Sequence, residues 1–360
     1  MSHTGPTEDD AARRSTRSGD TRLRSESSST RGMTVRVAVD ALGGDHAPVE
    51  VVAGAVDAAG DGIKPVLFGP PGIDPQGLEL VQCTEVVAMD AKPAEVVRAK
   101  PDSTLVRAVR AVGDGDAAAV VSAGNTGAML AASLLHVRRL PGVYRPGIAI
   151  VIPGRQGPTV LIDAGANADA RPEQLVQFAH MGTVFAEEIL DVRDPVVRLL
   201  SIGEEPEKGN QLTLEAHALL AQADLRFEGN AEGRGLLDGD ADVVVCDGFT
   251  GNVALKTLEG TIRGVLESLR AEIRQSTRGR IGGLLIRPAA RALRARLDPE
   301  TYGGGYLLGL RGLVVIAHGS SSRVAIANAT RMAARGVEHG LVEHVAARLA
   351  PAPGDASPSA

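Results

Sequence analysis

Six stretches of the chain share one arrangement: a short run of apolar residues, a loop of glycine and polar residues, and then apolar residues at helical spacing. The runs lack the apolar–polar alternation of a half-exposed strand, so they predict strands that are buried on both faces of a parallel sheet. Strands that alternate with helices predict a three-layer α/β/α domain with a largely parallel sheet. Shorter signals predict further strands over residues 65–68 and 81–89 and a helix over residues 102–112.

Each of the six apolar runs leads into a loop that carries polar side chains or glycine. The carboxyl ends of parallel strands lie at the same edge of a sheet, and right-handed crossovers leave few other arrangements. We therefore expect the six loops to come together at one ligand-binding edge. Their candidate catalytic or binding residues are Asp45, His46, Asn125, Thr126, Gly127, Asn167, Lys208, Asn210, Asp247, Gly251, Asn252, His318 and Ser320.

The loop after the run VVVC is the most informative of these loops. Asp247 ends the run, Gly251 allows a close backbone approach, and Asn252 is a good N-cap for the helix that comes next. Lys256 lies in the first turns of this helix, where a cation is unfavourable for the helix dipole unless an anion is bound beside it. The stretch therefore predicts an anion site. The alternative is a structural turn with a solvated lysine.

Composition narrows the classes of partner and cofactor. The chain has 360 residues, 44% of them hydrophobic, a formal net charge of −6 and no Trp, so it offers no aromatic platform for nucleic acid. Its two cysteines, Cys83 and Cys246, have no zinc or redox spacing, which favours a reducing cytosol. Neither a phosphate-binding GxxxxGK[ST] loop nor a dinucleotide motif is present, so we expect no metal and no cofactor.

Patterning also divides the chain into segments. Residues 1–33 are rich in Ser, Thr, Arg and Asp and predict a disordered extension, and residues 349–360 predict a flexible tail. Residues 34–348 are expected to form the catalytic α/β domain. No apolar run reaches the roughly 18 residues that a membrane span needs, and the amino terminus lacks a signal-peptide core.

A basic segment stands out from the acidic chain. Between Arg270 and Arg296 the sequence has eight arginines and one acid, Glu272. An amphipathic helix is expected to begin near Pro288, within an arm around residues 275–300. Gly282 and Gly283 are expected to hinge the arm, with Leu284 and Leu285 at its exposed tip as a membrane contact. Three interpretations remain open: a helix packed on its own core, a docking patch for an acidic protein, and an arm on anionic lipid.

Taken together, the motifs resemble the PlsX family of phosphate acyltransferases. The resemblance runs from about residue 35 to residue 340 through DALGGDHAP, SAGNTGA, DAGANADARPEQLVQFAHMG, SIGEEPEKGN, GNAEGR, VCDGFTGNVALKTLEG and HGSSS. It implies a fold like those of isocitrate and isopropylmalate dehydrogenases and of phosphotransacetylase. It also implies a homodimer that acts in the cytoplasm and associates with the inner face of the membrane. Two features depart from the family pattern: Gly305-Tyr306 after the Gly-Gly pair, and the amino-terminal extension.

The resemblance also implies a reaction, in which acyl carrier protein thioester and inorganic phosphate give acyl phosphate and free carrier protein. The product would serve a downstream glycerol-3-phosphate acyltransferase in phospholipid synthesis. Phosphate is largely a dianion near neutral pH, so the reaction needs no activated serine or cysteine. The demanding steps are holding the anion against the thioester and stabilising the oxyanion, which N–H groups and cations accomplish.

Roles for the candidate residues follow from this chemistry. Amides and backbone N–H groups are expected to bind phosphate and the oxyanion, a lysine to neutralise phosphate, and an aspartate to orient the lysine. His318 is expected to protonate the departing thiolate. For each Asn and Asp the alternative is a helix or turn cap, and for His318 a hydrogen-bonded structural role. The donors are Asn125, Thr126 and Asn252 with the backbone of Gly127 and Gly251, the lysine is Lys256 or Lys208, and the aspartates are Asp163 and Asp247.

Two other functions compete with acyl transfer. The first is an NAD-dependent decarboxylating dehydrogenase of a related fold, which would recruit Asp40, Asp163 and Asp247 to a metal site. The second is a non-catalytic scaffold that binds phosphate or acyl groups. Oxidation of a substrate with formation of NADH would indicate the first, and binding without turnover would indicate the second.

Overall fold

The computed structural model describes residues 34–297 and 302–350. The expected extension, residues 1–33, and most of the expected tail, residues 351–360, lie outside the described residues. Within them the chain forms one compact unit that begins at Thr34.

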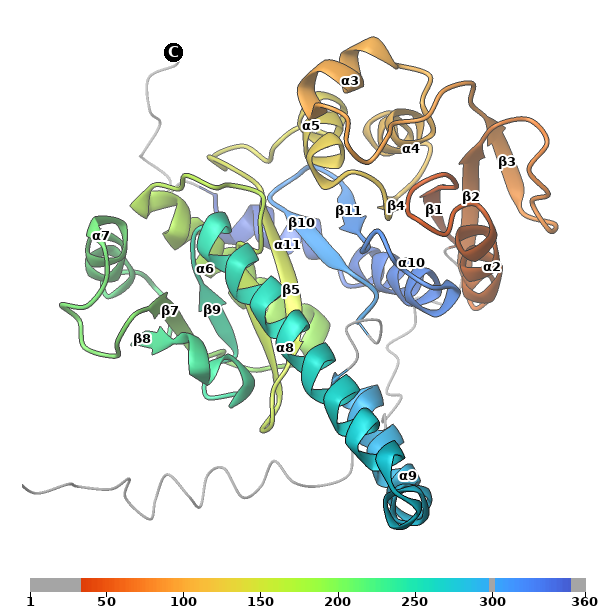
Figure 1. The fold of residues 1–360 in the computed structure, drawn as a ribbon. Coiled ribbons are helices and arrows are strands. Elements are labelled where there is room, and N and C mark those ends of the chain that lie inside the picture. Colours follow the sequence, from red (N-terminus) through yellow and green to blue (C-terminus); the bar gives the residue numbers. More distant parts are fainter. Residues whose placement is uncertain (1–33, 298–301, 351–360) are drawn as a thin grey trace, which may run out of the picture. The chain divides into compact units, whose positions relative to one another are not determined.

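The centre of the fold is a sheet of eleven strands in the order β3-β2-β1-β4-β11-β10-β5-β6-β9-β7-β8 (Figure 1). Among the described residues, most neighbouring strands pair in parallel, and only β5 and β10 pair antiparallel with their neighbours. The expected three-layer, largely parallel α/β fold is therefore confirmed. The strands are β1 (Val35–Asp40), β2 (Ile63–Gly69), β3 (Glu79–Gln82), β4 (Ala119–Ser122), β5 (Gly147–Pro153), β6 (Pro158–Ile162), β7 (Val197–Ser201), β8 (Phe227–Glu232), β9 (Val243–Val245), β10 (Gly305–Leu308) and β11 (Leu313–Ile316).

The two antiparallel strands reverse the direction of the sheet at its middle. β10 is antiparallel to β11, β5 to β10, and β6 to β5, so β6 runs opposite to β11. Strands β1 to β4 run in the direction of β11, while β7, β8 and β9 run in the direction of β6. The carboxyl ends of the two halves therefore lie at opposite edges. The expectation that all six loops meet at one edge is wrong, because the apolar runs do not reveal the direction of the hairpin strands between the halves.

Helices cover both faces of the sheet. Alternate residues of one strand enter different apolar clusters, with Val37 and Val39 on one face and Ala38 on the other. Each fully buried aliphatic side chain contributes about 1.5–3 kcal/mol, so this two-sided burial holds the layers together. One face packs against α2 (Val49–Ala58), α6 (Pro172–Leu190), α7 (Gln211–Leu220), α10 (Arg323–Glu338) and α11 (Leu341–Arg348), and the other against α3 (Pro93–Ala99), α4 (Thr104–Gly113), α5 (Thr126–His136) and α8 (Gly248–Gln275).

Most expected elements are present, with one error along the first half. The helix expected over residues 102–112 is α4, and the strand over residues 65–68 is part of β2. The strand expected over residues 81–89 is wrong, because β3 ends at Gln82. Beyond it the backbone makes only an isolated bridge between Glu85 and Ser103 and then forms a loop.

The arm consists of the second half of α8 and of α9 (Thr277–Leu297), which pack against each other (Figure 1). The helix expected to begin near Pro288 begins eleven residues earlier, where the Ser276 hydroxyl accepts a hydrogen bond from Gly279 N at 2.9 Å. Pro288 lies inside α9, so one backbone hydrogen bond is missing there. The last residues of the expected arm, 298–300, lie outside the described residues.

The two glycines expected to hinge the arm lie within α9. A Cβ added to Gly283 would come within 2.5 Å of Ile273 Cγ2 on α8, so glycine lets the two helices approach closely. Both glycines are therefore part of a continuous helix, and the hinge stays a prediction. Leu284 and Leu285 follow at once and are 67% and 77% exposed, as expected for an accessible surface, although the turn at Ser276 is the tip.

Candidate functional site

The first edge of the sheet gathers the loops after β1, β4 and β11. The buried carboxylate of Asp40 accepts a hydrogen bond from Ser122 Oγ at 2.7 Å, and the same hydroxyl accepts one from Gly124 N at 3.0 Å. Burial raises the pKa of the Asp40 carboxyl, and its hydrogen bonds act in the opposite direction. In the third loop, the Gly319 carbonyl accepts from Asp45 N at 2.7 Å. These contacts hold the three loops in one arrangement, with His46 beside Asp45.

Asn125 caps α5 at this edge. Its Oδ1 accepts from Ala128 N at 2.8 Å, and its Nδ2 donates to the carbonyls of Met89 at 2.7 Å and Ala91 at 3.2 Å. Thr126 and Gly127 are the first residues of α5. Because the Asn125 amide is engaged at both ends, the geometry favours the capping alternative for this residue.

A lysine–histidine cluster, made of Lys256, Glu259, His318 and Ser320, lies at the same edge. Lys256 Nζ is 3.2 Å from His318 Nε2 and donates to Glu259 Oε2 at 2.9 Å. On the far side of the imidazole, Nδ1 is 2.8 Å from Ser320 Oγ. The cluster joins α8, which belongs to the second half of the chain's sheet, to the loop after β11 in the first half.

The second edge holds the loops after β6, β7 and β9. Asp163 is fully buried and accepts from the backbone N–H groups of Ile148, Gly165, Ala166 and Asn167, and also from the Asn167 side chain. Burial raises the pKa of this carboxyl, and the hydrogen bonds from the backbone of Ile148, Gly165 and Ala166 and from the Asn167 side chain act in the opposite direction. Asn167 in turn donates to Pro146 O and accepts from Gly248 N at 2.7 Å. Asp163 and Asn167 thereby fix the start of α8.

Asp247, and not Asn252, caps α8. The Asp247 carboxylate accepts from Thr250 N at 2.9 Å and from Thr250 Oγ1 at 2.7 Å. The expectation that Asn252 is the cap is wrong, because the helix has already begun at Gly248, and the exposed Asn252 side chain lies in the second turn beside Gly165. A Cβ added to Gly251 would lie 1.9 Å from the Asp163 carbonyl, so only glycine fits there.

The loop after β7 contains the remaining candidates at this edge. The Asn210 side chain caps α7 by accepting a hydrogen bond from Thr213 N at 2.9 Å. The Lys208 carbonyl accepts one from Ser201 Oγ at 3.0 Å. Both residues follow a strand parallel to β9, so they share the edge of Asp247 and Asn252.

Helix α8 connects the two edges. A helix rises about 1.5 Å per residue, so the eight residues from Gly248 to Lys256 span about 12 Å, close to the length of a four-residue strand. The helix therefore begins at the second edge and brings Lys256 to His318 at the first. The helix dipole acts only within the first turn, and Lys256 lies beyond it, in contact with His318. An anion site at the start of α8 stays a prediction.

The chain is similar in sequence to known proteins over most of its length. A model of the family described as "Fatty acid synthesis protein" matches residues 35–344. A phosphate acyltransferase of Heliobacterium modesticaldum is 44% identical over 333 residues, which is 88% of this chain and 99% of the relative. The chain belongs to this family. A second phosphate acyltransferase, from Leptospira biflexa, is 43% identical over 327 residues, 87% of this chain and 96% of that one. The resemblance seen in the motifs is confirmed.

The fold of this family member is similar to that of several solved structures. A phosphotransacetylase from Streptococcus pyogenes has a TM-score of 0.57 at 18% identity and covers 85% of this chain and 94% of its own. A branched-chain phosphotransacylase from Enterococcus faecalis has a TM-score of 0.55 at 17% identity, covering 85% and 99%. The expectation of a phosphotransacetylase-like fold is confirmed.

The two cysteines of this family member do not supply a nucleophile. Cys246 is fully buried beside Asp163 and Asp247, and burial raises the pKa of its thiol well above the ordinary value. Burial likewise raises the pKa of Cys83 to about 11. The thiolate, and not the thiol, is the reactive form, so neither side chain is activated for attack.

The three aspartates considered for a metal site do not form one. Asp40 lies at the first edge, while Asp163 and Asp247 lie at the second, and all three accept hydrogen bonds from the protein. Over residues 34–297 and 302–350, no group of three His, Cys, Asp or Glu side chains is placed to hold a metal ion.

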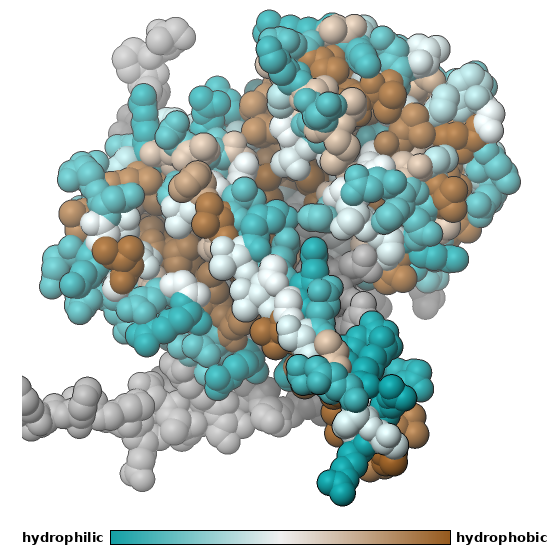
Figure 2. Space-filling view, viewed as in Figure 1, coloured by the Kyte–Doolittle hydropathy of each residue, from teal (hydrophilic) through white to brown (hydrophobic). Residues whose placement is uncertain are grey.

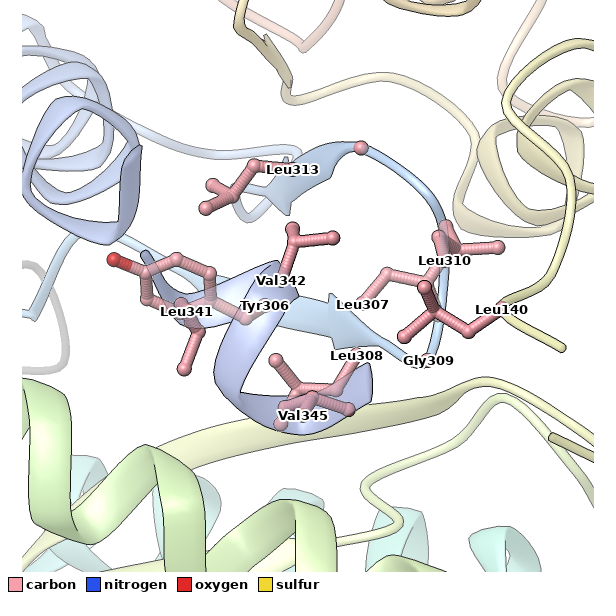
Figure 3. A pocket seen from close by; sticks show the side chains of 11 residues that line it. Leu140, Tyr306, Leu307, Leu308, Gly309, Leu310, Leu313, Leu341, Val342 and Val345 are labelled. Atoms are coloured by element: carbon pink, nitrogen blue, oxygen red, sulfur yellow. The ribbon is translucent and has the colours of Figure 1, made fainter. Parts of the chain in front are cut away.

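An apolar cavity lies under the β10–β11 turn, apart from the candidate residues of both edges. It measures about 10 Å³, barely room for one water molecule, and lies between the β10–β11 hairpin and α11 (Figure 3). Tyr306, where the sequence departs from the family pattern, lines it, packs edge-on against Phe185 and donates to the Met332 carbonyl. Tyr306 is thus a core residue, and none of the candidate site residues lines this cavity.

Sequence reasoning missed two parts of the candidate site. Glu259 holds Lys256, and its only signal is the spacing of three residues between opposite charges on a helix. The Asp40–Ser122 pair joins two loops, and its signal is a carboxylate at the end of an otherwise apolar strand.

Proposed function

We propose that the chain transfers the acyl group of an acyl carrier protein thioester to inorganic phosphate, releasing acyl phosphate and free carrier protein. The family and the names of its members support acyl transfer to phosphate. The observation that carries the proposal is the lysine–histidine cluster, which offers a cation and an imidazole at one point of the first edge. No cofactor is needed for this exchange, and neither cysteine is activated as a nucleophile.

In this proposal Lys256 neutralises the incoming phosphate, and His318 transfers protons. The loops at the first edge also carry Asp45, His46, Thr126, Gly127 and Ser320, and their backbone N–H groups can hold the oxyanion. Substrate binding also involves residues at the second edge, which are Asn167, Lys208, Asn210, Gly251 and Asn252. Asn252 lies on the same side of α8 as Lys256, which follows one turn later.

The direct test mixes purified protein, acyl carrier protein thioester and phosphate, and traps the product with hydroxylamine. We expect acyl hydroxamate to form only when phosphate is present, with release of the carrier thiol. Hydroxamate formation without dependence on phosphate would contradict the proposal, and binding without turnover would favour the scaffold function. Formation of NADH from a hydroxy acid would instead favour the dehydrogenase.

We also propose that the arm contacts an anionic membrane surface at the cytoplasmic face, where the acyl phosphate would pass to a downstream glycerol-3-phosphate acyltransferase. Figure 2 shows hydrophobic residues beside strongly hydrophilic ones on the arm. Ile281, Leu284 and Leu285 are all more than half exposed, close to a run of arginines. Among the described helices, none is both long and apolar enough to cross a membrane. Docking of the acidic carrier protein on the arm is the competing proposal.

A homodimer is proposed from the family resemblance. The expected molar mass in solution is twice the 37.2 kDa of one chain. Light scattering during gel filtration measures it directly, and a mass of one chain at micromolar concentration would contradict the dimer.

A further inference from the structure

The reaction proposed above moves one proton as well as one acyl group. Near neutral pH inorganic phosphate is divided between its monoanion and its dianion, and the more nucleophilic dianion still carries one hydroxyl proton. The acyl phosphate product is a mixed anhydride with no hydroxyl on its bridging oxygen, so it does not keep that proton. The departing thiolate takes one up, because its parent thiol has a pKa of about 8.5. Phosphate therefore loses one proton in the reaction, and the departing sulfur gains one.

We propose that Nε2 of His318 carries this proton from the attacking phosphate to the departing thiolate, with Lys256 and Ser320 holding the imidazole in the tautomer that accepts it. The inference rests on the proposed function and adds a base role that precedes the acid role of the same atom.

The tautomer follows from the partners of the ring. A lysine ammonium has donors only, so its contact with Nε2 at 3.2 Å makes Nε2 the acceptor. The ring proton then lies on Nδ1 and is donated to Ser320 Oγ at 2.8 Å. Ser320 N also donates toward Nδ1, at 3.3 Å, which alone would favour the other tautomer, but this neutral contact is weaker than the charge-assisted contact of the ammonium with Nε2. Nε2 is thus the unprotonated nitrogen of the ring, and it faces the lysine.

The groups around His318 include one cation, Lys256, which can bind phosphate, and two carboxylates. Lys256 and Glu259 face the imidazole from α8, and the Asp45 carboxylate approaches from the loop after β1, near Gly319. Nζ and Nε2 are close enough for one oxygen to lie within hydrogen-bond distance of both. There the phosphate receives a hydrogen bond from the ammonium and offers its hydroxyl proton to Nε2. Glu259 keeps the lysine in place during the exchange.

The step balances without another reactant. A phosphate oxygen bonds to the thioester carbonyl carbon, and its hydroxyl proton moves to Nε2. The carbon–sulfur bond then breaks with its electron pair on sulfur, and the proton moves from Nε2 to that sulfur. Thioester and hydrogen phosphate dianion thereby become acyl phosphate dianion and thiol.

The same tautomer argues against a covalent acyl-serine. Ser320 is next to a histidine, as a nucleophilic serine would be, but it accepts the Nδ1 proton and has no base on its own hydroxyl. Ser320 is therefore a positioning residue, and phosphate attacks the thioester directly.

Methylphosphonate provides the test at mildly alkaline pH, where it is a dianion with three phosphoryl oxygens and no hydroxyl proton. With phosphate, His318→Gln is expected to lower kcat for thiol release by about 10²-fold or more, the usual contribution of a general acid–base group. With methylphosphonate the same preparation is expected to lose less than about fivefold, since the wild-type relay has no proton to carry there. Comparing two acceptors on one preparation removes any effect of a smaller folded fraction.

Control variants sharpen the result. His344→Gln changes an exposed histidine that pairs with Glu188 and should leave both rates unchanged. Ser320→Ala should lower kcat about three- to tenfold with phosphate only, at constant KM, and Ser320→Thr should restore it. Equal losses with both acceptors in His318→Gln, or no wild-type turnover of methylphosphonate where it competes with phosphate, would overturn the relay. A wild-type protein that releases no thiol with phosphate would instead overturn the proposed function.

Discussion

At the scale of single residues, the charge of Lys256 is expected to matter to the proposed site and little to the fold. Its side chain is 48% exposed, and its pair with Glu259 is of the surface type that contributes little to stability. We expect Lys256→Ala to lower turnover about 10²-fold or more and to leave the melting temperature within a degree or two. Steady-state kinetics at varied phosphate and a thermal melt measure both, with Lys64→Ala as the matched control. Unchanged phosphate affinity and turnover would remove Lys256 from the site.

Two asparagines that look alike in the sequence should behave differently. Asn125 caps α5 and bonds to two carbonyls, so Asn125→Ala is expected to cost about 1 kcal/mol of stability or more. Asn252 lies inside α8 with an exposed side chain, so Asn252→Ala should leave the melt unchanged and lower kcat about tenfold or more. Denaturant unfolding and kinetics of both variants test this. An Asn252→Ala variant that lost only stability would assign it a structural role.

At the scale of elements, the sequence predicts the presence of strands and helices better than it predicts the residues at which they begin. Asp247 and Asn252 are both good caps, and only the position of Gly248 against Asn167 shows which one begins α8. In the arm, Pro288 gives the stronger signal for a helix start, yet Ser276 is the cap, because an exposed helix tolerates one missing hydrogen bond.

The arm should separate membrane contact from catalysis. Leu284→Glu with Leu285→Glu places two carboxylates on its exposed apolar surface, so the double variant is expected not to sediment with anionic vesicles. Acyl phosphate formation in solution should continue. The matched control is Leu214→Glu with Leu219→Glu on α7, which should sediment as the wild type does.

Two other results would each change the assignment of the arm. A double variant that still sediments with vesicles would show that these leucines are not the membrane contact. Normal vesicle binding with lost turnover of the carrier-bound substrate would assign the arm to carrier docking instead.

At the scale of the whole molecule, the apolar runs are enough to predict the layers and are not enough to predict which loops meet. Each run indicates a buried strand, but a buried strand has the same composition in either direction. The β5 and β10 strands are short apolar runs like the others, and their antiparallel pairing sends the loops of Asn125 and Asn252 to opposite edges. The pairing of Lys256 with His318, 62 residues apart, depends on that topology and could not be read from spacing.

Helix α8 starts at one edge, and the number of residues before Lys256 sets where its ammonium lies at the other edge. The first half of the helix should therefore tolerate no insertion or deletion. One added residue advances the rest of the helix by about 1.5 Å and turns it by about 100° around the helix axis. An alanine inserted after Val253 should therefore abolish turnover, whereas the same insertion after Glu267 only re-phases the arm and should preserve acyl transfer in solution. Full activity after the first insertion would contradict this requirement for a fixed helix length before Lys256. Natural length variation among relatives is expected beyond Glu259 and not before it.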